Sequence, residues 1–144
     1  MKQGITLLLA IFIGSLVLTL GMGVFTLLYG EFIFSSTTKD SLKAFFAADS
    51  GIECALYWDI RFNSFATSTT SAIVCDNDTI ASVGGSSGVS NFVVTFSDGS
   101  CTAVTVAKSD GGDTNITSLG QNMGDSACRS QSERVVQRGL EAHY

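Results

Sequence analysis

A long uncharged apolar run near the start of the chain limits what this sequence can fold into. Residues 4–30 contain no charged side chain, and residues 5–28 include fifteen Leu, Ile, Val or Phe residues. A helix needs about 20 predominantly apolar residues to cross the hydrocarbon core of a bilayer. The sequence therefore predicts a membrane-spanning helix over residues 5–34. Lys2 precedes the run and Glu31 follows its most apolar part, which favours an N-terminus on the cytoplasmic side.

The apolar run has two other interpretations. A cleaved secretory signal has an apolar core of about 7–15 residues and a small-residue exit site, so this run is too long to be typical of one. A plain single-pass membrane anchor fits the run equally well, and this alternative stays open on the apolar segment alone.

The helical pattern continues beyond the apolar run. Leu42, Phe45, Ala48 or Asp49, Ile52 and Leu56 recur at intervals of three and four residues, which marks one face of an amphipathic helix. The chain contains no proline that would force a break. We therefore expect one nearly continuous helix from about Ile5 to about Trp58. Its exposed positions are predicted to hold Lys39, Asp40, Lys43 and Asp59.

The length of this helix indicates that part of it lies outside the folded head. At 1.5 Å per residue the predicted helix is about 80 Å long, whereas the rest of the chain forms a head only a few tens of ångströms across. Half of the helix must then lie outside the head. Because that half is the apolar one, we expect it to lie in lipid or among other copies of the chain.

Four cysteines indicate an oxidising compartment. Their number is even, and no pair has the C-x-x-C spacing that is typical of structural zinc. Two disulfides outside the cytoplasm are the favoured interpretation, and four reduced buried thiols are the alternative. Four cysteines allow three pairings. Of these we predict Cys54–Cys75 and Cys101–Cys128, each closing a loop whose cross-link contributes about 3 kcal/mol in the chain-entropy model.

The clearest local structure in the second half is a β-hairpin. Two β-rich runs, NFVVTF and CTAVTVAK, flank Asp98-Gly99, which is a strong signal for a two-residue hairpin turn. That register puts one set of side chains on the face predicted to pack against Phe45, Ile52 and Leu56 of the helix. The set consists of Phe92, Val94, Phe96, Cys101 and Ala103, with Val93, Thr95, Thr102, Val104 and Val106 on the other face.

Further strands are expected over residues 71–75, 115–119 and 133–140, with Cys128 in the last loop. Residues 82–90 are rich in Gly and Ser and predict a flexible link. The predicted fold class is α+β, with one long helix packed against three to five antiparallel strands. The predicted organisation is a short leader at residues 1–4, a membrane or filament-core half at 5–34, and an extracytoplasmic head at 35–144.

Composition argues against several function classes. The formal net charge is −5 and the basic residues are scattered along the sequence, so nucleic-acid binding is not indicated. The single histidine, His143, is a poor candidate base, and Asp76 and Asp78 lie in a polar stretch that would not raise a carboxyl pKa. The stretch at 110–113 is expected to be a turn rather than a calcium loop. No motif predicts a cofactor or metal, so we expect a protein that is not an enzyme.

Three segments together resemble the type IV pilin-like family, in particular the PilX-type minor pilins and the related tip pseudopilins of type II secretion. The first is Lys2-Gln3-Gly4 followed by ITLLLAIFIGSLVL, and the second is KAFFAADSGIECALYW at residues 43–58. The third is RVVQRGLEAHY at residues 134–144, which is similar to a terminal strand of the family. The first two segments cover about the first sixty residues, and the head is matched only loosely.

The resemblance implies processing and assembly. A prepilin peptidase would cut after Gly4, and Ile5 would become the N-methylated first residue of the mature chain. The implied partners are other pilin subunits, the prepilin peptidase, an inner-membrane assembly platform and membrane lipid. The implied location is the bacterial cytoplasmic membrane, with the N-terminus inside and the head outside, and then a cell-surface filament.

One position departs from the pattern of major pilins. These carry Glu at the fifth mature position, where this chain has Leu9. That difference favours a minor subunit that initiates assembly or lies at the filament tip. The alternatives are that Gly4 is not the cleavage site, or that the chain is an anchored binding module that does not polymerise.

Overall fold

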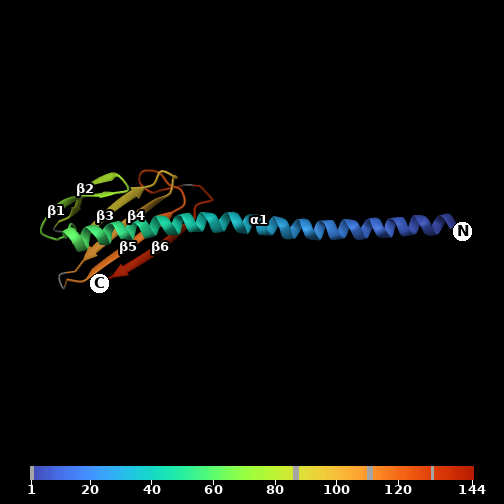
Figure 1. Ribbon diagram of the computed structural model, residues 1–144, viewed down its shortest axis with the longest axis horizontal. Helices are drawn as coiled ribbons and strands as arrows, with labels where there is room; N and C mark the ends of the chain where they lie inside the picture. The colour runs from blue at the N-terminus through green and yellow to red at the C-terminus, as the bar shows by residue number, and fades with distance from the viewer. Residues whose placement is uncertain (1, 86–87, 110–111, 131) are drawn as a thin grey trace. The chain divides into compact units, whose positions relative to one another are not determined.

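The computed structural model describes residues 2–85, 88–109, 112–130 and 132–144 (Figure 1). The chain divides into two compact units, Met1–Thr38 and Lys39–Tyr144, which are described separately. Among the described residues there is one helix, α1 (Lys2–Phe62), followed by six strands. These are β1 (Thr70–Cys75), β2 (Asp78–Gly84), β3 (Val89–Thr95), β4 (Cys101–Lys108), β5 (Thr114–Gln121) and β6 (Gln137–His143).

The first unit is the apolar part of α1. Every side chain from residue 4 to residue 35 is exposed, although most of them are apolar. Ser15 and Thr26 donate their hydroxyl hydrogens to the carbonyl oxygens of Phe12 and Gly23 at 2.8 Å. These bonds satisfy the hydroxyl groups within the helix, which lowers the cost of placing them in lipid. An 18-residue window with a mean hydropathy of 2.4 makes α1 long and apolar enough to cross a membrane.

The second unit confirms the predicted fold class, because a helix packs against a small antiparallel sheet. The main sheet has the strand order β3-β4-β5-β6, and all three pairings are antiparallel. β1 and β2 form a separate two-stranded hairpin. The helix ends at Phe62, four residues beyond the predicted end, because Asn63 adopts a left-handed conformation with φ of 50°. The amide of Asn63 donates to the carbonyl of Asp59 at 2.8 Å, which is a common way to end a helix.

Small residues, rather than the large ones predicted, bring the helix onto the sheet. Of the predicted stripe, Ala48 and Ile52 are buried and Leu56 is partly buried against the core, whereas Leu42 and Phe45 are exposed. The residues that pack against the sheet are Ala44, Ala48, Gly51 and Ala55. A Cβ atom at Gly51 would lie 2.7 Å from Thr102 Cγ2 and 2.9 Å from Val104 Cγ2. Such a close approach requires a residue without a side chain at this position.

The predicted hairpin is present, but its register is shifted by one residue. Thr95 pairs with Cys101, and the Phe96 amide donates to the Ser100 carbonyl at 2.9 Å. Gly99, with φ of 82°, therefore ends a three-residue loop instead of completing a two-residue turn. A shift of one residue moves alternate side chains to the opposite face of a strand. The buried partners of Phe92 and Val94 are consequently Val104 and Thr102, not the predicted Cys101 and Ala103.

Other strand predictions need correction as well. The structure has six described strands instead of three to five, because β2, which follows the turn at Asp76-Asn77, was not predicted. Both turn residues have positive φ, of 46° and 68°, as a two-residue hairpin turn requires. Residues 82–84 of the predicted link belong to β2, and residues 89–90 belong to β3. The last strand begins at Gln137 and not at residue 133. Residues 86–87 and 110–111 lie outside the described residues, so part of the link and of the predicted turn at 110–113 is not covered.

Two disulfides stabilise the head, and they join the predicted pairs. Cys54 of α1 is bonded to Cys75 at the end of β1. Cys101 at the start of β4 is bonded to Cys128 in the loop between β5 and β6. The first therefore ties the small hairpin to the helix, and the second ties the long loop to the main sheet.

Candidate functional site

The predicted processing site lies in the first turns of α1. Gly4 and Ile5 are both exposed, and a Cβ atom at Gly4 would meet no other atom within 4 Å. Leu9 is exposed too. No described residue packs against Gly4, and cleavage of the Gly4–Ile5 bond stays a prediction.

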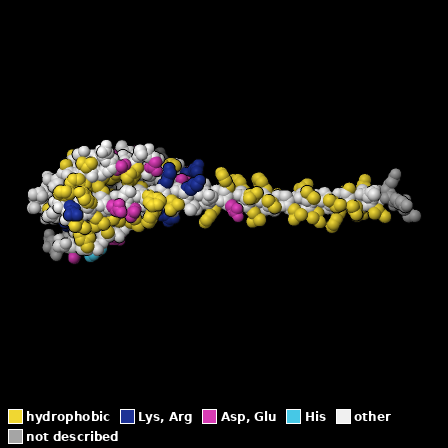
Figure 2. Space-filling model, in the orientation of Figure 1, with side chains coloured by type: hydrophobic (Ala, Val, Ile, Leu, Met, Phe, Trp, Pro, Cys, Tyr) yellow, Lys and Arg dark blue, Asp and Glu magenta, His cyan; other side chains and the backbone are white. Residues whose placement is uncertain are grey.

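Exposed apolar side chains follow the first unit along its length, and Figure 2 shows those on the visible face. Its large side chains are more than two-fifths exposed from Ile5 to Phe34. Phe25 and Tyr29 stack on one another, with ring centroids 6.2 Å apart. Glu31 is the only charged residue between residues 4 and 38. A surface of this size and polarity is stable only when lipid or protein covers it.

A buried polar cluster in the head was missed by the sequence prediction. Asp59 was expected to be exposed, but it is 5% exposed at the end of α1. Its carboxylate lies 2.8 Å from the Lys108 ammonium at the end of β4. It also accepts a 2.6 Å hydrogen bond from the hydroxyl of Tyr144, which follows β6. Asn63 accepts a further hydrogen bond from Lys108 at 3.3 Å.

This cluster joins the helix to the end of the interior strand β4 and to the residue that follows the edge strand β6. Burial, together with the neighbouring Asp59 carboxylate, raises the pKa of the Tyr144 hydroxyl above its ordinary value. The backbone of Tyr144 also pairs with Thr114, through bonds of 2.7 and 3.1 Å. A buried carboxylate needs such partners, because an unpaired charge in the interior is costly. The cluster is therefore a structural clamp at the end of the head.

We expect Tyr144→Phe to destabilise the head by about 2 kcal/mol at neutral pH, because it removes a hydrogen bond to a charged group. Since the pKa of Tyr144 is raised on folding, its contribution is full below pH 10 and is lost as the pH rises above that. The stability difference between the two chains should therefore shrink above about pH 10. Urea unfolding of both chains at several pH values, monitored by the fluorescence of Trp58, measures the difference in their unfolding free energy. A difference that grows with alkaline pH would contradict the assignment.

The remaining candidate residues do not gather into a site. His143, Asp76 and Asp78 are all exposed, and they lie on β6, on the β1–β2 turn and on β2 respectively. Within the described ranges, no three His, Cys, Asp or Glu side chains come together as metal ligands would. Within the described residues, Asp76 and Asp78 therefore share no site with other metal-ligating side chains.

Comparison of the chain with protein-family models, curated proteins and solved structures found no significant match. The class of protein is therefore defined only by its fold and by its exposed apolar surface. It is an α+β protein with one helix that is able to cross a membrane and a head that carries two disulfides.

Proposed function

We propose that this chain is a structural subunit of a type IV pilus-like filament, of the PilX-type minor pilin kind, which acts in assembly initiation or at the tip. The observation that carries the proposal is the division of roles along α1. Its residues 5–34 are apolar and exposed, whereas its residues 44–55 include the small side chains that pack on the sheet. The same helix therefore packs in the folded head and also presents an apolar surface that lipid or protein must cover.

The energetics of that surface favour two successive environments. Burial of apolar area contributes about 25 cal/mol per Å², so an uncovered segment of this length is strongly unfavourable in water. Lipid covers it before assembly, and other pilin subunits cover it within a filament. The hydroxyls along the helix already bond to its own carbonyls, so either environment accepts them.

The proposed function also includes processing of the N-terminal segment. A prepilin peptidase removes residues 1–4, and Ile5 becomes the N-methylated end that enters the filament through the inner-membrane assembly platform. A leucine at position 9 leaves no carboxylate to neutralise the amino terminus of a neighbouring subunit, which suits a subunit at the tip. The two disulfides support a head outside the cytoplasm, because disulfides persist in oxidising compartments.

Cross-linking within cells separates this function from that of an anchored module that does not polymerise. A photo-reactive amino acid at Phe25, which is 67% exposed, should form covalent bonds to other pilin subunits in cells that assemble filaments. The same group at Ser97, on the exposed β3–β4 loop, is the matched control for contacts of the head. Products at Phe25 that contain lipid but no protein, in cells that display filaments, would favour the anchored module.

A further inference from the structure

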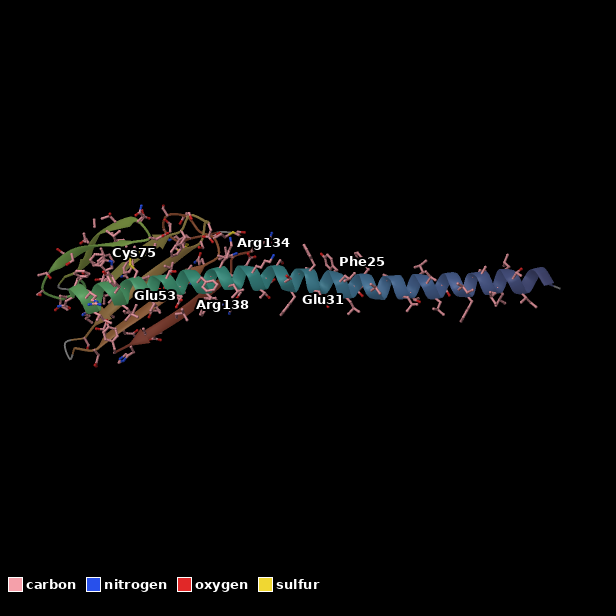
Figure 3. The ribbon with its side chains drawn as sticks, viewed as in Figure 1. Phe25, Glu31, Glu53, Cys75, Arg134 and Arg138 are labelled. Carbon is pink, nitrogen blue, oxygen red and sulfur yellow. A yellow bond between two sulfur atoms is a disulfide. The ribbon has the colours of Figure 1, made fainter. Side chains whose placement is uncertain are left out.

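Four basic residues gather around the first turns of the head. Lys39 and Lys43 belong to α1, and both are exposed. Arg138 of β6 donates from Nε to the hydroxyl of Ser41 at 2.8 Å. Arg134, from the loop before β6, lies 3.9 Å from the Asp40 carboxylate. Figure 2 shows blue side chains at this end of the head, and Figure 3 labels the two arginines beside the helix. We call these four residues the basic collar.

The collar has more positive than negative charge, although the chain as a whole is acidic. Its four cations face two carboxylates, Asp40 and Asp98, of which the second lies 3.6 Å from Lys43. Glu133, next to Arg134 in the sequence, is exposed. These ion pairs are long and exposed, and pairs of that kind hold their partners weakly. Arg134 remains 75% exposed despite its pair. The collar can therefore bind an additional anion without breaking a buried contact.

The position of the collar along the chain identifies the anion. The apolar segment ends at Phe34, and Lys39 and Lys43 follow it by 5 and 9 residues. At 1.5 Å per helical residue these distances are at most about 8 and 14 Å along the axis. The polar headgroup layer begins where the hydrocarbon core ends and is about 5–8 Å thick on each side. The backbone of Lys39 lies at the outer edge of this layer, and Lys43 reaches it through its long flexible side chain. Ser41 and Asp40 hold the two arginines at the same level of the helix.

We propose that the basic collar binds the headgroups of anionic phospholipids on the side of the bilayer where the head lies. Arginine guanidinium groups suit phosphate because they donate two parallel hydrogen bonds, and lysines add flexible positive charge. The inference rests on the membrane-spanning part of the proposed function and is independent of filament assembly. Bound lipid would hold the head against the membrane surface until the subunit is extracted.

The lipid selectivity of the full chain tests whether the basic collar binds anionic headgroups. The chain is reconstituted in phosphatidylcholine vesicles with trace spin-labelled phosphatidylglycerol or spin-labelled phosphatidylcholine, and electron paramagnetic resonance gives the ratio of their association constants. We expect a preference of roughly fivefold for phosphatidylglycerol, which falls as salt screens the charges. Lys39→Gln/Lys43→Gln should reduce it to about twofold, because half of the collar remains. This pair of changes leaves the contacts of both arginines intact.

Arg61→Gln is the control, since it removes an exposed cation in the last turn of α1, 22 residues beyond Lys39, and should leave the preference unchanged. A preference that Lys39→Gln/Lys43→Gln does not alter, or that the control lowers equally, would overturn the proposal. So would the absence of lipid preference together with binding of a DNA duplex through the collar. Failure of the chain to float with vesicles would overturn membrane anchoring as well, whereas flotation without selectivity would overturn the collar alone.

Discussion

Replacing Gly120 with alanine should destabilise the head by about 3 kcal/mol, which is the upper part of the usual range for overpacking. Gly120 lies in β5 beneath α1. A Cβ atom there would overlap the backbone carbonyl oxygen of Ala44 and the backbone nitrogen of Ala48. Backbone atoms of a helix cannot rotate away as a side chain can. The helix would have to separate from the sheet, which would open the contact made by the small residues.

Urea unfolding of the full chain in detergent, followed by the fluorescence of Trp58, measures this loss. Gly139→Ala on the neighbouring strand β6 is the matched control, because its Cβ atom would meet only the flexible side chain of Leu119, at 3.1 Å. That variant should unfold within about 1 kcal/mol of the original chain. Equal stability of the Gly120 and Gly139 variants would contradict the close packing of α1 on β5.

Removal of the Cys101–Cys128 disulfide is expected to have a similar effect. The bond closes a loop with a sequence separation of 27 residues, so the double change to alanine should cost about 3 kcal/mol. Both cysteines are buried. Among the described residues of the loop that carries Cys128, Gly124 bonds to Gly99 of the β3–β4 loop, whereas the bonds of Asn122 go to Arg134 and Val136 of the same loop. The loop should therefore become accessible to protease before the rest of the head.

Limited proteolysis and urea unfolding of Cys101→Ala/Cys128→Ala measure both consequences. The original chain treated with reductant should behave as this variant does, and the comparison separates loss of the bond from loss of the side chains. A variant as stable and as resistant to protease as the oxidised chain would show that the loop is held by other contacts.

The sequence predicted the type of most elements but not how they pack. The apolar run and the three-to-four spacing that follows it predicted one helix, and α1 has nearly those bounds. The same spacing selected Phe45 and Leu56 for the core, because a hydrophobicity pattern favours large side chains. Close contact instead uses Gly51 and Gly120, which contribute nothing to such a pattern.

Register and long-range contacts were harder to predict. Asp98-Gly99 predicted a hairpin correctly, but a glycine also ends three-residue loops, and the choice between them changes every face assignment. The clamp around Asp59 depends on Lys108 and Tyr144, which are far away in the sequence, so no local signal could identify it. The Gly4–Ile5 processing site was predicted from resemblance alone, and the fold does not test it.

The proposed function requires removal of a short leader, which releases the apolar helix for assembly. The intact mass of the chain, isolated from membranes of cells with an active prepilin peptidase, tests this most directly. We expect a chain that lacks residues 1–4 and carries one methyl group on Ile5, whereas a Gly4→Val chain retains its first four residues. A full-length, unmethylated chain, in cells that process another substrate of the same peptidase, would rule out the proposed processing.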